Sequence, residues 1–346
     1  MRVSAPLSLT ALAATGLLLA GCAAPVDSEQ PTEPAADGAF TLYSGRDEEL
    51  VQPLIDQFEA ETGIEVEVRY GNTAELGALL LEEGDATPAD VFLSQDAGAL
   101  GALSQAGLFT TLPADVTDAV PAGFTSTDGS WVGVTGRARV VVFDGERLTA
   151  DQLPDDIDDY VDPEWNGRVG VAPSNASFQS FVTALRVLDG EDDAAEWVSA
   201  LAGNSPQIFE GNSAILTAVD EGVLEVGLIN HYYWYGLAAE AGEENMRAQL
   251  KFLEAGDAGS IVNVTGAGIL NGAATDADAL EFVRYLVSLE AQTYFVEQTF
   301  EYPLLPGVDA PAGLPSLESL INPELDLSDL DDLATTQQLL ADAGLI

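Results

Sequence analysis

Two adjacent tyrosines, Tyr232 and Tyr233, are the residues whose type and spacing suggest the most specific chemistry. They follow the short apolar segment 225–229 and lie within the run Asn-His-Tyr-Tyr-Trp-Tyr of residues 230–235. A phenol is normally neutral, with a pKa of about 10, but a small and highly charged cation deprotonates the ligand that it binds. Two phenolates offer hard anionic oxygens, which suit a hard metal such as Fe(III).

The local backbone decides whether both phenols can reach one metal. Successive strand residues point to opposite faces, so the pair converges only if the strand has given way to a loop or a helix start. Runs of Tyr and Trp more often pack with their polar ends in water, and this alternative stays open on the hexapeptide alone. His231 is the only histidine, and we expect it behind the ligands or at the surface. With no second His or Cys beside it, a zinc-type cluster is excluded.

The chain begins with the pattern of a targeting segment. A Met-Arg start precedes an apolar run at 7–20, which has the length of a secretory signal and ends in Leu-Ala-Gly-Cys at residues 19–22. This ending resembles a bacterial lipobox, so residues 1–21 are predicted to be a signal peptide and Cys22 the lipidated first residue of the mature protein. The alternative is a fortuitous cysteine. Because Cys22 is the only cysteine, no disulfide forms within the mature domain.

Composition limits the class of partner. Residues 22–38 combine prolines and acids with almost no large apolar groups and are predicted to be a flexible tether. The whole chain has 58 acidic and 11 basic residues, a balance that repels nucleic acid and anionic lipid headgroups. The acids are spread along the chain, which favours a role in solvation at high salt or in solubility. Attraction of cations is the alternative.

The segment 40–106 alternates between strand and helix patterns. Three apolar strand patterns are separated and followed by helical ones, and a βαβαβ order implies a parallel sheet with helices on its faces. Ligands of such sheets bind beyond the carboxyl ends of the strands. These ends are the polar segments Ser44–Asp47, Tyr70–Asn72 and Ser94–Asp96.

The next part of the chain predicts a hinge and a second lobe. Residues 131–137 and 139–143 are strand-like with little between them, so a long strand can pass between lobes. In the second lobe, Pro173–Ser177 and Gly211–Ser213 are small, polar openings of predicted helices. Helix N-termini are ready anion sites, although simple capping explains the same residues.

Further elements are predicted toward the C-terminus. They are a return strand at 260–265, one or two helices at 276–295, a Pro-rich connection at 303–315 and an amphipathic helix at 328–343.

Taken together, these features make the chain similar to the bacterial ferric-ion-binding proteins, the extracellular solute-binding components of iron(III) ABC importers. The resemblance runs from about residue 40 to the C-terminus, and the tyrosine motif is its most specific part. The similar segments are 42–48, 88–95, 136–142, 173–178, 211–213, 229–234 and 301–303.

The resemblance implies an α/β fold of the two-lobed periplasmic-binding-protein type, each lobe a mixed sheet flanked by helices, with the ligand cleft between them. Lobe 1 is expected to comprise residues 39–137 and 263–313, and lobe 2 residues 138–262 and 314–346. The two lobes would close on the ligand by a hinge.

The resemblance also implies a ligand set. Tyr232 and Tyr233 would bind iron, and Asp47 and Gln95 stand where some members use a His and a Glu to complete the iron shell. A synergistic anion, phosphate or carbonate, is expected at the helix openings. Its expected contacts are Asn175, Ala176, Ser177, Asn212 and Asn230, with Asp96 facing the cleft and Arg137 at the place of a carbonate-binding arginine. Pairing of Arg137 with one of the many acids is the alternative.

The expected function is high-affinity capture of ferric iron outside the cell and delivery to the permease and ATPase of an ABC importer. The protein is expected to be a monomer, anchored by lipid to the outer face of the cell membrane, and not an enzyme. One His allows no Ser–His–Asp set, and neither a P-loop nor a GxGxxG follows the first strand. A solute-binding lipoprotein for a polyamine or a phosphonate-type molecule is the alternative, and composition alone leaves a carboxylate-only hydrolase open.

Overall fold

The structure, a computed structural model, describes residues 36–320 and 325–346. The predicted signal peptide 1–21, Cys22 and the part of the predicted tether before residue 36 lie outside the described residues. Within the described part of the chain, no helix is both long and apolar enough to cross a membrane. Because Cys22 is not among the described residues, the lipid anchor stays a prediction.

Strands and helices alternate in the first part of the fold, as predicted. The elements are β1 (Ala39–Ser44), α1 (Glu48–Thr62), β2 (Glu65–Tyr70), α2 (Thr73–Glu83), β3 (Val91–Ser94) and α3 (Ala97–Gln105). In α1 the apolar residues at helical spacing, from Val51 to Phe58, are buried, and Gly63 ends the helix with a φ of 77°. β1 is parallel to both β2 and β3, so the carboxyl ends of these strands meet at one edge of the sheet.

A single strand, β4 (Trp131–Asp144), replaces the two strands predicted at 131–137 and 139–143. All of its residues are buried. It pairs antiparallel with β9 (Val262–Ile269) as far as Ala138 and with β7 (Val226–Asn230) from Arg139 onward. The chain therefore does not break between the two apolar runs, and only the neighbouring strand changes at this point.

The second part of the fold again alternates strands and helices. Its elements are β5 (Val169–Val171), α5 (Ala176–Leu188), α6 (Glu191–Gly203), β6 (Gln207–Ile208), α7 (Asn212–Asp220), β7, α8 (His231–Ala241) and β8 (Ala248–Lys251). β5 is parallel to β6 and to β7. The predicted helix openings at residues 173–177 and 211–213 lead into α5 and α7, so both are confirmed as helix starts.

The short helix α4 (Ala114–Thr117) precedes β4 in the chain. The elements that follow β9 are α9 (Ala277–Leu286), α10 (Leu289–Tyr294), a π-helix at Phe295–Thr299, β10 (Tyr302–Pro303) and α11 (Leu333–Asp342).

Two predicted boundaries in this region are wrong. The final helix starts at Leu333 instead of residue 328, because Leu327–Asp331 forms a separate 3₁₀-helix and the Asp332 side chain caps α11 by accepting a hydrogen bond from the backbone N–H of Thr335. The return strand starts at Val262 instead of residue 260 and continues to Ile269.

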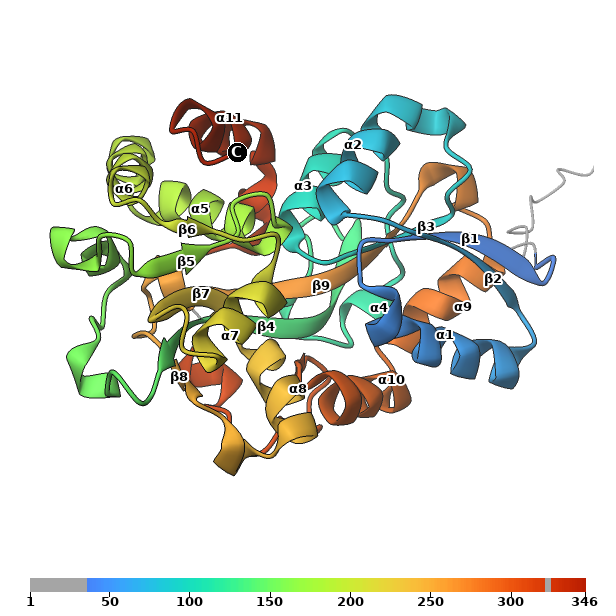
Figure 1. The fold of residues 1–346 in the computed structure, drawn as a ribbon. Coiled ribbons are helices and arrows are strands. Elements are labelled where there is room, and N and C mark those ends of the chain that lie inside the picture. Colours follow the sequence, from blue (N-terminus) through green and yellow to red (C-terminus); the bar gives the residue numbers. More distant parts are fainter. Residues whose placement is uncertain (1–35, 321–324) are drawn as a thin grey trace, which may run out of the picture. The chain divides into compact units, whose positions relative to one another are not determined.

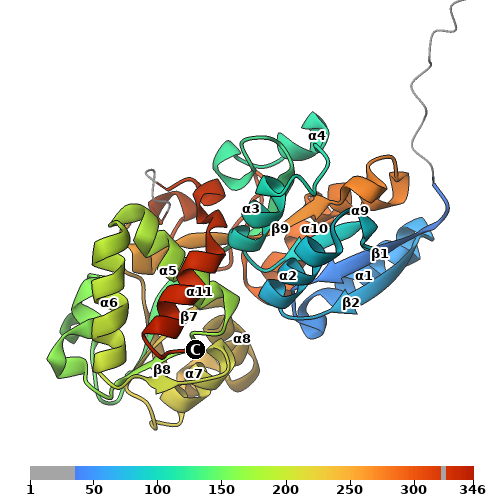
Figure 2. The ribbon, with the colours of Figure 1, turned by 90° about the horizontal axis from the view of Figure 1, so that it is seen from above.

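The ten strands of the described residues form one mixed sheet in the order β2–β1–β3–β9–β4–β7–β5–β6, with β8 and β10 also paired to β4. In the first part of the sheet, α2 and α3 lie on one face and α1, α9 and α10 on the other (Figure 1). In the second part, α5 and α6 lie on one face and α7 and α8 on the other. Figure 2 shows α11 beside α5 and α6, and it also contacts α3. The predicted mixed α/β class is confirmed, whereas the exact lobe boundaries stay predictions.

Candidate metal centre

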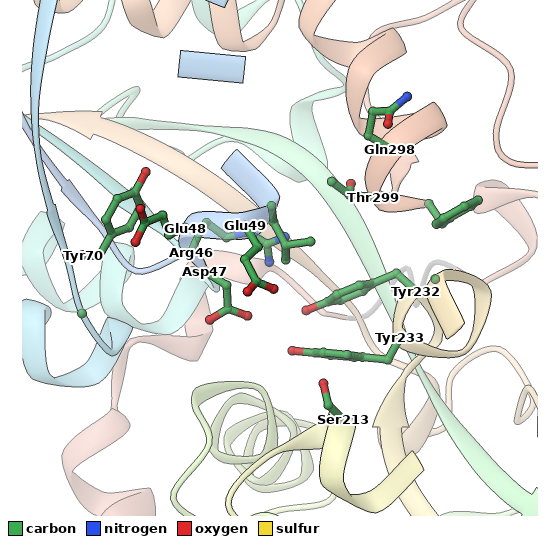
Figure 3. A pocket seen from close by; sticks show the side chains of 14 residues that line it. Arg46, Asp47, Glu48, Glu49, Tyr70, Ser213, Tyr232, Tyr233, Gln298 and Thr299 are labelled. Atoms are coloured by element: carbon green, nitrogen blue, oxygen red, sulfur yellow. The ribbon is translucent and has the colours of Figure 1, made fainter. Parts of the chain in front are cut away.

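The two tyrosines lie in the first turn of α8, directly after β7 ends at Asn230. The strand gives way to a helix start at this point, which meets the condition for the two phenols to converge, and it brings them together. The rings of Tyr232 and Tyr233 stack with their centroids 4.2 Å apart and their planes inclined by 28°. Figure 3 shows both hydroxyl groups pointing into the same cavity.

This cavity has a volume of about 580 Å³. Its walls come from the loop between β1 and α1, the first turn of α1, the end of β2, α7, α8 and the end of the π-helix. The lining residues are Arg46, Asp47, Glu48, Glu49, Leu50, Tyr70, Gly71, Ser213, Tyr232, Tyr233, Gly236, Gln298, Thr299 and Phe300. The cavity therefore joins the carboxyl ends of two parallel strands to the tyrosine turn, as expected for a ligand site of an α/β fold.

The environment of the phenols keeps the Tyr233 proton in place when nothing is bound. Tyr232 is 3% exposed, and its hydroxyl has no hydrogen-bond partner at normal geometry among the described residues. Burial raises the pKa of Tyr233 well above its ordinary value, the neighbouring Tyr232 and the charge of Asp47 raise it further, and Arg46 opposes them. A cation that binds here must therefore displace a phenol proton.

Arg46 is a buried positive charge beside the Tyr232 ring, in the lining of the cavity. Its guanidinium carbon lies 5.6 Å from the centre of the Tyr232 ring, and one of its nitrogens pairs with the fully buried carboxylate of Glu301. Burial lowers the pKa of Arg46, but the attraction of Glu301, together with smaller contributions from Tyr232, Tyr233 and Asp47, more than offsets this, so the pKa is raised above its ordinary value. Glu301 also accepts a hydrogen bond from the Thr135 hydroxyl, so it anchors Arg46 to β4.

His231 is not at the surface, which corrects one of the two predicted locations. It is fully buried. Its Nδ1 accepts a hydrogen bond of 3.1 Å from the backbone N–H of Ala138, and its Nε2 donates to the carbonyl oxygen of Phe300 at 2.9 Å. Both ring nitrogens are therefore used by the backbone, and His231 supports the tyrosine turn from behind. Burial lowers the pKa of His231 to about 4, which keeps the ring neutral.

The structure places only one of the two further predicted ligands at the cavity. Asp47 precedes α1, is exposed and lines the wall opposite the tyrosines. Gln95 follows β3 and does not line the cavity, and its backbone N–H donates to the Thr73 hydroxyl at 3.0 Å. The role of Gln95 as an iron ligand therefore stays a prediction.

The five predicted anion contacts on α5, α7 and α8 form one group beneath the tyrosine turn. Asn175 caps α5, which begins at Ala176, by accepting from the Ser177 backbone N–H at 3.0 Å and from the Ser177 hydroxyl at 2.6 Å. The Asn212 side chain donates to Asn175 Oδ1 at 3.4 Å and accepts from the backbone N–H of Asn230 at 3.1 Å. None of the five lines the cavity, although the next residue along α7, Ser213, does.

Arg137 and Asp96 lie together near the centre of the sheet, away from the cavity lining. Arg137 is buried and donates to the carbonyl oxygen of Val264 at 3.3 Å. The Asp96 carboxylate caps α3 by accepting from the Gly98 backbone N–H. Burial raises the pKa of Asp96, and the charge of Arg137 acts to lower it. These positions leave the predicted anion role of both residues untested.

Sequence reasoning missed Glu49 as a cavity residue, and it placed Arg46 at the ligand-binding edge only as part of the segment Ser44–Asp47, with no role of its own. Figure 3 shows the Glu49 carboxylate directed toward the Tyr232 hydroxyl. The available signal was an acid in the first turn of the helix after a polar strand end. Among the described residues, no group of three or more His, Cys, Asp or Glu side chains is arranged to hold a metal, so a metal site in this cavity has to include the tyrosines.

Comparison with known proteins gives concordant matches. The family model for bacterial extracellular solute-binding proteins matches residues 86–322. The chain is 33% identical to the Fe(3+)-binding periplasmic protein of Serratia marcescens, over 90% of this chain and 92% of that protein.

Two solved structures are similar as well. Iron-bound HitA from Pseudomonas aeruginosa has a TM-score of 0.83 at 31% identity, over 89% of this chain and 99% of that one. The Trichodesmium protein IdiA (FutA), in complex with iron and citrate, has a TM-score of 0.75 at 29% identity, over 89% of this chain and 100% of that one.

Proposed function

The chain belongs to the family of bacterial extracellular solute-binding proteins, and from this premise we propose that it captures ferric iron outside the cell for an ABC importer. The observation that carries the proposal is the stacked pair of tyrosines with both hydroxyls in one cavity. Relatives named for binding Fe(3+), and a neighbour solved with iron, support the same cargo. The predicted absence of enzymatic activity agrees with relatives that are named for binding.

The capture chemistry follows from the phenols. Fe(III) displaces the protons of Tyr232 and Tyr233, and the two phenolates then hold it as hard anionic ligands. Asp47 faces them and offers a third anionic oxygen. Gln95 lies outside the cavity, so it reaches the metal only if the two predicted lobes move relative to each other.

A ferric ion needs more oxygen donors than two phenols and one carboxylate provide. The fold offers two sources. One is an exogenous phosphate or carbonate, held near Asn175, Ser177 and Asn212 at the helix openings. The other is the acidic first turn of α1 on the opposite wall.

Delivery would follow the pattern of the family, in which the monomeric binding protein hands its cargo to a permease driven by an ATPase. We place the protein at the outer face of the cell membrane, anchored through a lipid on Cys22. Substitution Cys22→Ser should leave iron binding intact and move the protein from the membrane fraction to the soluble fraction. Continued membrane association of the variant would remove the lipid anchor from the proposal.

A ferric titration tests the central claim. Iron loading should produce a visible phenolate-to-iron absorption band that is lost in Tyr232→Phe and in Tyr233→Phe. Tyr235→Phe is the matched control, because Tyr235 belongs to the same helix but does not line the cavity. Iron affinity that is unchanged in the two cavity variants would count against the proposal.

A further inference from the structure

The cavity wall opposite the tyrosines carries a concentrated negative charge. Asp47, Glu48 and Glu49 are consecutive, exposed and all part of the lining. Arg46 is the only Lys or Arg among the lining residues, and its charge is already neutralised by Glu301. This wall therefore attracts a cation and repels an exogenous anion. The chain's net charge of −47 also favours cations over anions.

The tyrosines and the acids face each other across the cavity. The Tyr232 hydroxyl is buried, has no partner at normal geometry among the described residues and points into the cavity. Figure 3 shows the carboxylates of Asp47 and Glu49 directed toward the two phenol oxygens. Glu48 instead faces Tyr70, whose pKa is raised to about 12 by burial and by the charge of Glu48. Two of the three acids are therefore aimed at the place where iron would bind.

The predicted anion contacts, by contrast, are largely engaged with one another. The Ser177 backbone N–H and hydroxyl both donate to Asn175. The Asn212 side chain is shared between Asn175 and Ser177 at 3.4 and 3.5 Å, and the Asn230 backbone N–H donates to Asn212. An anion that bound here would have to replace these internal hydrogen bonds, so part of its binding energy would be lost.

Charge balance points the same way. Fe(III) bound to two phenolates keeps one positive charge, which a single carboxylate neutralises. A second carboxylate makes the site anionic, and a phosphate or carbonate added to this set would be repelled by it. Resting on the function proposed above, we propose that Asp47 and Glu49 complete the oxygen shell of the ferric ion in place of an exogenous anion. The cargo is then the ferric ion alone, without an accompanying anion or chelator.

The test asks whether iron stays bound without any small anion. The full protein is loaded from ferric nitrilotriacetate and passed through a desalting column in buffer free of phosphate and carbon dioxide. We expect the visible band to persist, with equimolar iron and neither nitrilotriacetate nor phosphate in the protein fraction. Loss of the band on desalting with recovery on adding phosphate, or an anion that coelutes at one per iron, would overturn the inference.

Two variants address the carboxylates directly. Asp47→Asn and Glu49→Gln should each lower iron affinity in the anion-free buffer by at least about tenfold, an effect that is common even for residues that only support a metal ligand. Added phosphate should restore part of the loss. Glu75→Gln is the control, because Glu75 is an exposed acid in the first turn of α2 and lies outside the cavity. Variants that bind iron as tightly as this control would contradict the inference.

The outcomes separate this inference from the proposed function. A wild-type protein that shows no phenolate band in any buffer, with or without phosphate, would refute iron capture itself. A band that appears only when an anion is present would leave iron capture standing and refute only the carboxylate shell.

Discussion

The backbone N–H of Ala138 donates a hydrogen bond of 3.1 Å to Nδ1 of His231. Ala138 is the last residue of β4 that pairs with β9, so the bond is made where β4 changes its neighbouring strand. On the other side of the ring, Nε2 donates to Phe300, which lines the cavity. His231 thus connects the tyrosine turn, the strand crossing and the cavity wall, although it does not face the cavity itself.

The first prediction concerns the stability of the iron-free protein when His231 is replaced. His231→Phe should lower the free energy of unfolding at pH 8 by about 1–3 kcal/mol for each of the two buried backbone groups that it leaves unpaired. Urea unfolding followed by circular dichroism measures this loss.

The pH dependence of the same variant gives a second check. Burial lowers the pKa of His231 from 6.5 to about 4 in the folded protein, so below pH 6.5 the unfolded chain binds a proton that the folded chain does not. The wild type should therefore lose about 3 kcal/mol through this group between pH 6.5 and 4, whereas the variant should not. A stability difference between the two proteins that stays constant over this range would contradict the account.

The second prediction concerns the buried ion pair of Arg46 and Glu301, whose side chains are 1% and 0% exposed. Glu301→Gln leaves the Arg46 charge buried without a counter-charge, which should cost about 3–5 kcal/mol of unfolding free energy. The double variant Arg46→Met with Glu301→Gln should regain part of this loss, because no unpaired charge remains. Urea unfolding of the single and the double variant measures the two losses of unfolding free energy. A double variant less stable than the single one would show that Arg46 contributes by packing and not by charge.

The elements of this fold were predictable where the pattern is local. Periodic apolar residues such as those of α1 specify a helix and its buried face by themselves, and the tyrosine pair lies at a helix start because Asn230 ends a short apolar strand. The polar strand end at Asp47 was also visible, since side chains beyond parallel strands form ligand sites.

Features that depend on long-range packing were not predictable. Glu301 is an acid, a residue type that is expected at the surface from sequence alone. Its burial is stabilised by an ion pair with Arg46, which lies near the other end of the chain. The continuity of β4 depends on β7 taking over from β9 at Arg139. Gln95 and Asp96 follow a strand that ends at the same sheet edge, yet the cavity forms beside β1 and β2, so neither lines it.

The third prediction concerns the contact between α3 and the C-terminal segment. A Cβ atom on Gly101 would lie 2.8 Å from Cβ of Asp331 and 3.2 Å from its Cα, so Gly101→Ala should cost about 1–3 kcal/mol of stability through overpacking. Gly203→Ala at the end of α6 is the matched control, because nothing lies within 4 Å of its added Cβ. Helix propensity should make this control more stable, by up to about 1 kcal/mol. Equal melting temperatures of the two variants would show that the C-terminal segment shifts away from the added methyl group without loss of stability.

The fourth prediction concerns protons. Because burial holds the pKa of Tyr233 well above its ordinary value, this phenol is neutral until iron arrives, and binding through both phenolates should release about two protons per ferric ion into solution. Proton release is measured by back-titration in weakly buffered solution.

The same exchange of protons for iron makes acid weaken binding. The logarithm of the iron affinity should therefore fall by about two for each pH unit of acidification near neutrality, after correction for hydrolysis of the free metal. In Tyr233→Phe any residual binding should release one proton fewer. A variant that releases as many protons as the wild type would place the displaced proton on a group other than Tyr233.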